Sequence, residues 1–149
     1  MPPSRERITI RVMRPADYDA VCDVWRTAGL AVKPQGRDAR GAMLSQLRRF
    51  PTTYLVAEAG ARLVGVVLGT HDHRKGWINR LAVIPAYRGC GIAKRLIARC
   101  EQALAAMGIE IVSALVEEGN DASCATFRAA GYSDEVRVTY FRKLARPDI

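Results

Sequence analysis

A glycine-rich stretch, RGCGIA at residues 88–93, holds the residues of this sequence best suited to bind an anion. A helical pattern begins directly after it. The N-terminus of a helix has unpaired N–H groups and the positive end of the helix dipole, and glycines let a phosphate approach that backbone. We therefore expect the N–H groups of residues 89–94 to form an anion-binding cradle, with Arg88, Lys94 and Arg95 adding positive charge. The same glycines would also suit a tight turn that binds nothing.

The elements before this stretch indicate an antiparallel meander. Strand patterns occupy residues 7–13, 52–59, 62–71 and 75–83. The last three are separated by short turns, which is typical of strands that pair as hairpins. Two helical patterns, residues 17–29 and 38–50, lie between the first and second strands, and we expect Asp17 and Asp38 to cap them.

The elements after the stretch complete an α/β (α+β) fold. The helix that follows the glycines ends at Gly108, residues 109–116 read as a buried strand, and a short helix lies between Asn120 and Gly131. Residues 135–144 predict one or two final strands. The order is β-α-α-β-β-β-α-β-α-β-β. It predicts a mixed, mostly antiparallel sheet of six to seven strands with helices on both faces.

Composition limits the class of protein. The 149 residues are expected to form a single domain over residues 1–149, with 26% charged residues and no apolar run of about 20 residues that could cross a membrane. The N-terminus has no apolar signal region, which favours the cytoplasm. The four cysteines form no CxxC pair, so neither a disulfide framework nor a metal site is expected.

The net charge of +8 suits any polyanion but does not select one. The basic residues are spread along the chain, without the block of like charge typical of a nucleic-acid-binding arm. We expect neither a nucleic acid nor a membrane as partner.

The position of the glycines in the chain excludes two common phosphate-binding loops. No GKS or GKT follows, as a P-loop requires, and a Rossmann loop would follow the first strand of a βαβ unit. Here the glycines follow the third strand of a meander.

This arrangement resembles the GNAT family of N-acetyltransferases. The main match is INRLAVIPAYRGCGIAKRLI at residues 78–97, which contains the family's acyl-CoA signature, [R/Q]-x-x-G-x-[G/A], at residues 88–93. Asn120, Gly131 and Tyr132 match a second family pattern on the later helix. Within the family, HDHRKGW and EEGND are similar to small bacterial YpeA-like acetyltransferases.

The resemblance implies acetyl-CoA as co-substrate and no metal. The strand backbone at residues 81–83 would pair with the pantetheine arm, the N–H groups after Arg88 would hold the pyrophosphate, and Asn120 would hydrogen-bond the pantetheine or serve only as a helix cap. Cys90 is expected to be a loop residue, because family members transfer the acyl group directly. The cofactor-binding residues implied are Leu81, Ala82, Val83, Arg88, Gly89, Cys90, Gly91, Ile92, Ala93, Lys94, Asn120 and Phe127.

The sequence departs from the family at the residues that move protons. Phe127 replaces the usual general-acid tyrosine, and Asn79 and Arg80 stand where many relatives have a glutamate. The remaining catalytic candidates are Glu117 and Glu118 as general base, or as a solvated pair, and Tyr132 as acid, with Tyr140 as a further candidate.

Two functions follow. The first is an acetyl-CoA-dependent N-acetyltransferase acting on a primary amine of a small molecule or protein. The acceptor pocket would be built by the first two helices, their connecting loop at residues 29–37, and the last strands. The alternative is a CoA-binding module with little or no transferase activity, which Phe127 and the missing glutamate keep open. A homodimer is compatible with either.

Overall fold

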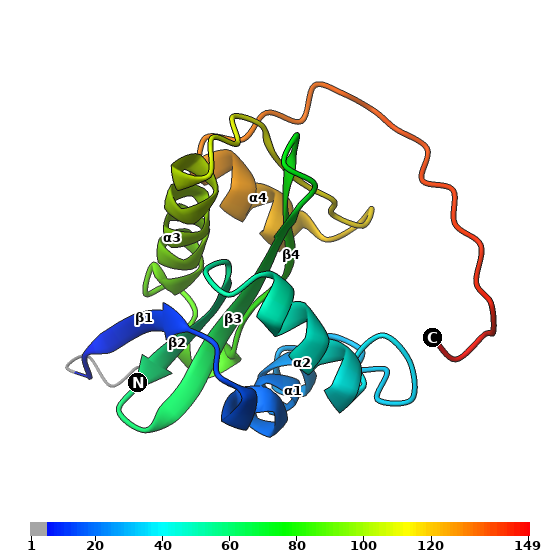
Figure 1. Cartoon of the computed structure of the whole chain (residues 1–149). Helices are drawn as coiled ribbons and strands as arrows, with labels where there is room; N and C mark the ends of the chain where they lie inside the picture. Colours follow the sequence, from blue (N-terminus) through cyan, green and yellow to red (C-terminus); the bar gives the residue numbers. More distant parts are fainter. Residues whose placement is uncertain (1–5) are drawn as a thin grey trace.

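Five strands form one mixed sheet in the computed structural model, which describes residues 6–149 (Figure 1). The start of the expected domain, residues 1–5, lies outside the described residues. The strands lie in chain order and are β1 (Ile8–Val12), β2 (Tyr54–Ala59), β3 (Arg62–His71), β4 (Gly76–Val83) and β5 (Val112–Ala114). The first four pair antiparallel, which confirms the meander, and β5 pairs parallel to β4.

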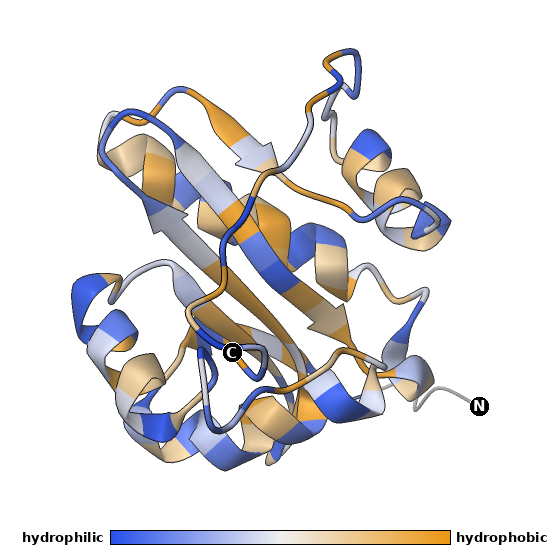
Figure 2. Ribbon diagram, turned by 90° about the vertical axis from the view of Figure 1, so that its right-hand side faces the viewer, coloured by the Kyte–Doolittle hydropathy of each residue, from blue (hydrophilic) through white to orange (hydrophobic). Residues whose placement is uncertain are grey.

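Helices cover both faces of the sheet. They are α1 (Tyr18–Thr27), α2 (Arg40–Arg49), α3 (Ile92–Ala106) and α4 (Asp121–Ala129), with short 3₁₀ turns η1 (Pro15–Asp17) and η2 (Pro85–Tyr87). Figure 1 shows α1 and α2 on one side of β3 and β4, and α3 and α4 on the other. The apolar side chains of β2 and β3 are almost all buried between these layers. Figure 2 colours hydrophobic stretches of the central strands orange. The mixed α/β class is confirmed.

The helix α3 packs very closely on the sheet, because glycines face it. A Cβ at Gly69 of β3 would collide with the Cys100 sulfur of α3 and lie 2.8 Å from the Cβ of Thr53. A Cβ at Gly76 of β4 would lie 2.7 Å from Leu104 Cδ1. Because Gly69 and Gly76 have no side chains, α3 can lie close against the strands, and this contact positions the glycine-rich turn at the start of the helix.

The C-terminal strands are not formed, so the sheet has five strands rather than six or seven. Residues 133–145 run outside the sheet, and Val136, Tyr140 and Phe141 are 82%, 71% and 88% exposed. Figure 2 shows this segment crossing in front of the strands. Without a neighbour on its far side, β5 has three partly buried residues instead of the buried strand expected over residues 109–116.

Both expected aspartate caps have other roles. Asp38 precedes α2, whose N-cap is Ala39, and the Asp38 carboxylate accepts a hydrogen bond from the Lys33 N–H at 2.8 Å. Asp17 occupies the N-cap position of α1 without a side-chain cap. Its carboxylate instead pairs with Arg11 of β1 at 2.8 Å. The Asp17 carboxylate therefore joins η1 to β1, whereas the Asp38 carboxylate binds within the loop between α1 and α2.

Candidate functional site

The glycine-rich turn has the backbone geometry expected of an anion-binding cradle. Gly89 and Gly91 have φ of +78° and +76°, a region that glycine adopts without strain. Gly91 is the N-cap of α3, and its carbonyl accepts the first helical hydrogen bond from the Arg95 N–H at 3.1 Å. The N–H groups of the first turn of α3 have no partner within the helix. No atom lies within 4 Å of a Cβ built at either glycine, so the space above the turn is open.

Two of the three basic side chains expected at the cradle are turned onto backbone carbonyls. Arg88 donates to the carbonyl of Val83 at 3.1 Å and to that of Ala28 at 3.3 Å. Arg95 donates to the carbonyl of Ile8 on β1 at 3.1 Å. The positive potential at the turn therefore depends on the backbone and on Lys94, which is exposed.

The strands β4 and β5 separate just before this turn. Their parallel pairing joins residues 76–78 to residues 112–114 and stops there, while β4 continues to Val83. On the side facing β5, residues 79–83 have no strand partner among the described residues. Leu81, Ala82 and Val83 therefore lie along an open edge, where an extended amide-bearing chain can add to the strand.

A β-bulge interrupts β4 at the same place. Val66 pairs with Ala82, whereas Leu68 pairs with Asn79, so Arg80 and Leu81 together face Val67. A bulge leaves one backbone N–H outside the ladder. Arg80 has φ of +54°, a conformation that costs a non-glycine residue about 1–3 kcal/mol.

The helix α4 supplies Asn120 and Phe127. Asn120 is the N-cap, and its side-chain oxygen accepts a hydrogen bond from the Ser123 N–H at 3.2 Å, which leaves its amide nitrogen free to donate. Phe127 is a core residue, 9% exposed, whose ring packs edge-on against Tyr132 with centroids 5.2 Å apart.

The three catalytic candidates differ in their surroundings. Tyr132 packs beside α3, where its hydroxyl oxygen is buried and has no hydrogen-bond partner among the described residues. Burial raises the pKa of Tyr132, and the Glu101 carboxylate on α3 raises that pKa further. Glu117 and Glu118 are exposed in the loop between β5 and α4. Cys90 is exposed in the glycine-rich turn.

A further cluster lies at the bulge. We call Trp25, Ala31, Asp38 and Arg80 the Arg80 cluster. The Arg80 guanidinium lies 4.3 Å from the centroid of the Trp25 ring, donates to the Ala31 carbonyl at 2.7 Å and lies 3.6 Å from the Asp38 carboxylate. Burial lowers the pKa of Arg80, and the negative charge of Asp38 opposes that shift. In the sequence, Arg80 stands out only as one of two residues where many relatives have a glutamate, and Asp38 only as an expected helix cap, so the contacts of this cluster were not predicted.

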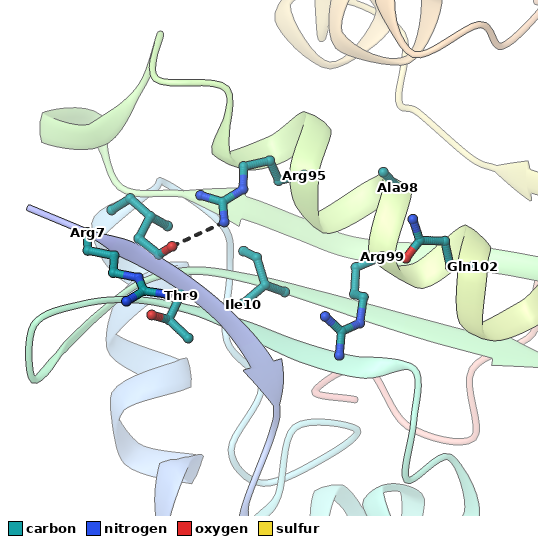
Figure 3. Close-up of a pocket in the computed structure, with 8 residues that line it drawn as sticks. Arg7, Thr9, Ile10, Arg95, Ala98, Arg99 and Gln102 are labelled. Carbon is teal, nitrogen blue, oxygen red and sulfur yellow. Dashed lines mark hydrogen bonds between the residues drawn. The ribbon is translucent and has the colours of Figure 1, made fainter.

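A basic groove of about 390 Å³ lies elsewhere, between β1 and α3 (Figure 3). Arg7, Arg95 and Arg99 line it together with Thr9 and Gln102. This groove is at the β1 edge of the sheet, and it shares Arg95 with the first turn of α3. Among residues 6–149, no group of three or more His, Cys, Asp or Glu side chains could hold a metal ion. No helix in the described part of the chain is long and apolar enough to span a membrane.

Comparison with known proteins identifies the family. The model of the acetyltransferase (GNAT) family matches residues 18–132. Acetyltransferase ECA0875 of Pectobacterium atrosepticum is 33% identical over 135 residues, which cover 91% of this chain and 94% of that protein. Acetyltransferase plu1384 of Photorhabdus laumondii is 36% identical over 125 residues, covering 84% and 86%. The chain belongs to the acetyltransferase (GNAT) family.

Solved structures share the fold at lower identity. The PaiA N-acetyltransferase of Thermoplasma acidophilum, in complex with coenzyme A, is 19% identical with a TM-score of 0.74, covering 83% of this chain and 87% of that chain. AAC(6')-Iy, in complex with the bisubstrate analogue CoA-S-monomethyl-acetylneamine, is 19% identical with a TM-score of 0.71, covering 93% and 99%. The family and the fold together make this chain an acyltransferase.

Proposed function

We propose that the protein, as one domain over residues 1–149, transfers an acetyl group from acetyl-CoA directly to a primary amine of a small molecule or protein. The observation that supports this most is the position of the glycine-rich cradle at the end of β4, beside the open edge of residues 79–83. In this proposal the cradle binds the pyrophosphate, the open edge pairs with the pantetheine arm, and Asn120 donates to that arm. The CoA-bound relatives of the same fold support the assignment.

The acceptor amine must lose a proton. A primary amine of pKa about 10 is mostly protonated at neutral pH. The neutral nitrogen then attacks the thioester carbon and a C–N bond forms. The C–S bond breaks, CoA leaves as a thiolate, and the nitrogen gives up its second proton, which the thiolate can take up to become the free thiol. We assign proton removal to Glu117 or Glu118 through water, since both carboxylates are exposed in the loop that follows β5.

Backbone groups of β4 stabilise the oxyanion in this proposal. The bulge at Arg80 and Leu81 leaves one N–H outside the ladder, and a fixed N–H donor directed at the developing charge lowers the barrier. The departing thiolate needs no dedicated acid if its pKa is near the ordinary thiol value of about 8.5. Phe127 in place of a tyrosine is compatible with that step, and Tyr132 then has a packing role between α3 and α4.

The second candidate is a CoA-binding module with little transferase activity. Two observations favour it: a phenylalanine at the usual acid position, and the partly buried Arg80, with its guanidinium beside Asp38, at the usual glutamate position. Such a protein would bind acetyl-CoA at the same cradle and release no thiol.

The test has two stages. Calorimetry first measures binding of acetyl-CoA. Thiol release is then followed with polyamines, amino acids, aminoglycosides, and peptides with free N-termini or lysines. Release with one class of amine would support the transferase and define its acceptor class. Binding without release from any amine would favour the binding module, and absence of binding would contradict both.

A further inference from the structure

Arg80 is an unusual residue for its backbone position. Only it and His73 among the non-glycine residues at positions 6–149 have a positive φ, and His73 lies in the turn between β3 and β4. Arg80 lies inside β4, at the bulge. Glycine would adopt φ of +54° without strain. The presence of arginine there indicates that its side chain makes contacts that outweigh the backbone strain and that a glycine could not make.

Trp25 binds Arg80 at two points. This tryptophan is completely buried in α1, with 0% exposure. Its Nε1–H donates to the Arg80 carbonyl at 3.1 Å, and its ring lies under the Arg80 guanidinium. The first contact holds the backbone of the bulge, and the second fixes the direction of the side chain.

The guanidinium then reaches the loop between α1 and α2. It donates to the Ala31 carbonyl at 2.7 Å and lies 3.6 Å from the Asp38 carboxylate, which itself accepts from the Lys33 N–H. Asp38 is 4% exposed. A buried carboxylate requires a partner, since the charge is otherwise uncompensated. Arg80 therefore holds the start and the end of this loop through one cation.

We propose that Arg80 is a positioning residue that joins the two halves of the reaction site. Through Trp25 it fixes the β4 bulge, beside which the acyl group would lie. Through Ala31 and Asp38 it holds residues 31–38 against β4 as a preformed wall for the acceptor. This role rests on the proposed function, in which the bulge meets the thioester and this loop meets the amine.

Arg80→Gly is the sharpest test, because glycine keeps the bulge conformation while the guanidinium is lost. We expect folded protein whose acetyl-CoA dissociation constant stays within about twofold of the wild type. We expect the amides of residues 31–38, apart from Pro34, to exchange with solvent at least about tenfold faster, and kcat/KM for the acceptor to fall at least about tenfold. Arg80→Lys should recover only part of this, since an ammonium lacks the planar fork that stacks and donates together.

His73→Gly is the matched control. It removes a side chain at the other positive φ, in a turn that the Arg80 cluster does not contact, and should leave amide exchange at residues 31–38 and the kinetics unchanged. If Arg80→Gly shows wild-type exchange in this loop and wild-type kinetics, the proposal is overturned. If the wild type neither binds nor uses acetyl-CoA, the proposed function fails. Exchange in the unliganded protein still decides whether Arg80 holds the loop.

Discussion

Two glycines, one at each end of α3, separate the effect of a substitution on cofactor binding from its effect on folding. Gly91 has φ of +76° with open space where a side chain would stand, and Gly108, after the end of the same helix, has φ of +78° with the same open space. The strain of replacing either glycine is therefore similar. Only Gly91 belongs to the cradle.

Gly91→Glu should abolish acetyl-CoA binding, because a carboxylate would occupy the cradle and repel the phosphates. Gly108→Glu should bind acetyl-CoA like the wild type with a similar loss of thermal stability. Calorimetry and thermal unfolding of the two variants check this. Equal acetyl-CoA affinity in both variants would show that the pyrophosphate does not bind at the start of α3.

Asn120 can be tested in the same way, because its oxygen caps α4 while its nitrogen remains free. Asn120→Ala should cost about 1 kcal/mol of stability through the lost cap and should weaken acetyl-CoA binding. Asn120→Asp keeps the cap oxygen but removes the N–H donor. It should retain stability and still bind acetyl-CoA more weakly. If the Asn120→Asp variant binds acetyl-CoA with wild-type affinity, Asn120 serves only as the cap of α4.

The backbone conformation of the glycine-rich turn and the cap at Asn120 could be predicted from the sequence. Both are local features, because they depend on residues that are near neighbours in the chain. The partners of Arg88, Arg95, Asp38 and Arg80 could not be predicted, since each side chain contacts an element distant in sequence. A charge at a given position indicates that a partner is needed, but not which element supplies it.

At the scale of elements, the packing of α3 on β3 depends on the absence of a side chain at Gly69. Gly69→Ala should destabilise the protein by about 1–3 kcal/mol, the usual cost of overpacking a core, measured by urea unfolding. Gly41→Ala in α2 is the control, because no atom lies within 4 Å of its Cβ and alanine favours a helix over glycine. A stable Gly69→Ala protein would show that α3 can shift on the sheet.

Acid should weaken the junction of β1 with η1 and β2. Arg11 bonds Asp17 and Glu58, each at 2.8 Å, and these hydrogen bonds lower the pKa of both carboxyls. A carboxyl with a lowered folded-state pKa stabilises the protein above its ordinary pKa of about 4. That contribution is lost as the pH falls through the lowered value.

The free energy of unfolding should therefore fall on acidification below about pH 4. Urea unfolding of Asp17→Asn at pH 7 and pH 3 should show lower stability at pH 7 and a smaller decrease on acidification than the wild type. Asp19→Asn is the control, because the Asp19–Arg40 pair is exposed, with side chains 79% and 53% accessible. An equal decrease in the free energy of unfolding of the wild type and of Asp17→Asn would show that the Arg11–Asp17 pair does not contribute to the acid response.

At the scale of the whole molecule, the net charge of +8 should assist binding of an anionic cofactor. Raising the salt from about 0.01 M to 0.1 M shortens the Debye length from about 30 Å to 10 Å. Acetyl-CoA should therefore bind several-fold more weakly at the higher salt. A phosphate-free acetyl-pantetheine is the control and should bind equally at both. Salt-independent acetyl-CoA affinity would mean that contacts within the cradle carry the binding.

The sequence predicted the mixed class and the meander, because alternation and short turns are local signals. It did not predict where pairing would stop. Residues 135–144 have strand-like alternation, yet they pair with no strand of the sheet. The neighbouring strand β5 therefore lacks a partner on its outer side and is only three residues long. Pairing depends on which edge is reachable in the folded chain, which a pattern within one segment does not contain.

The close contacts under α3 also bear on protein engineering. Gly65 faces Leu96, Gly69 faces Cys100 and Gly76 faces Leu104, so contacts recur along the length of the helix. The body of α3 is thus held on the strands independently of the turn that precedes it. Grafting residues 85–91 from a relative should transplant a different cofactor loop onto an unchanged support, whereas a graft that includes α3 would need its own matching set of strand glycines.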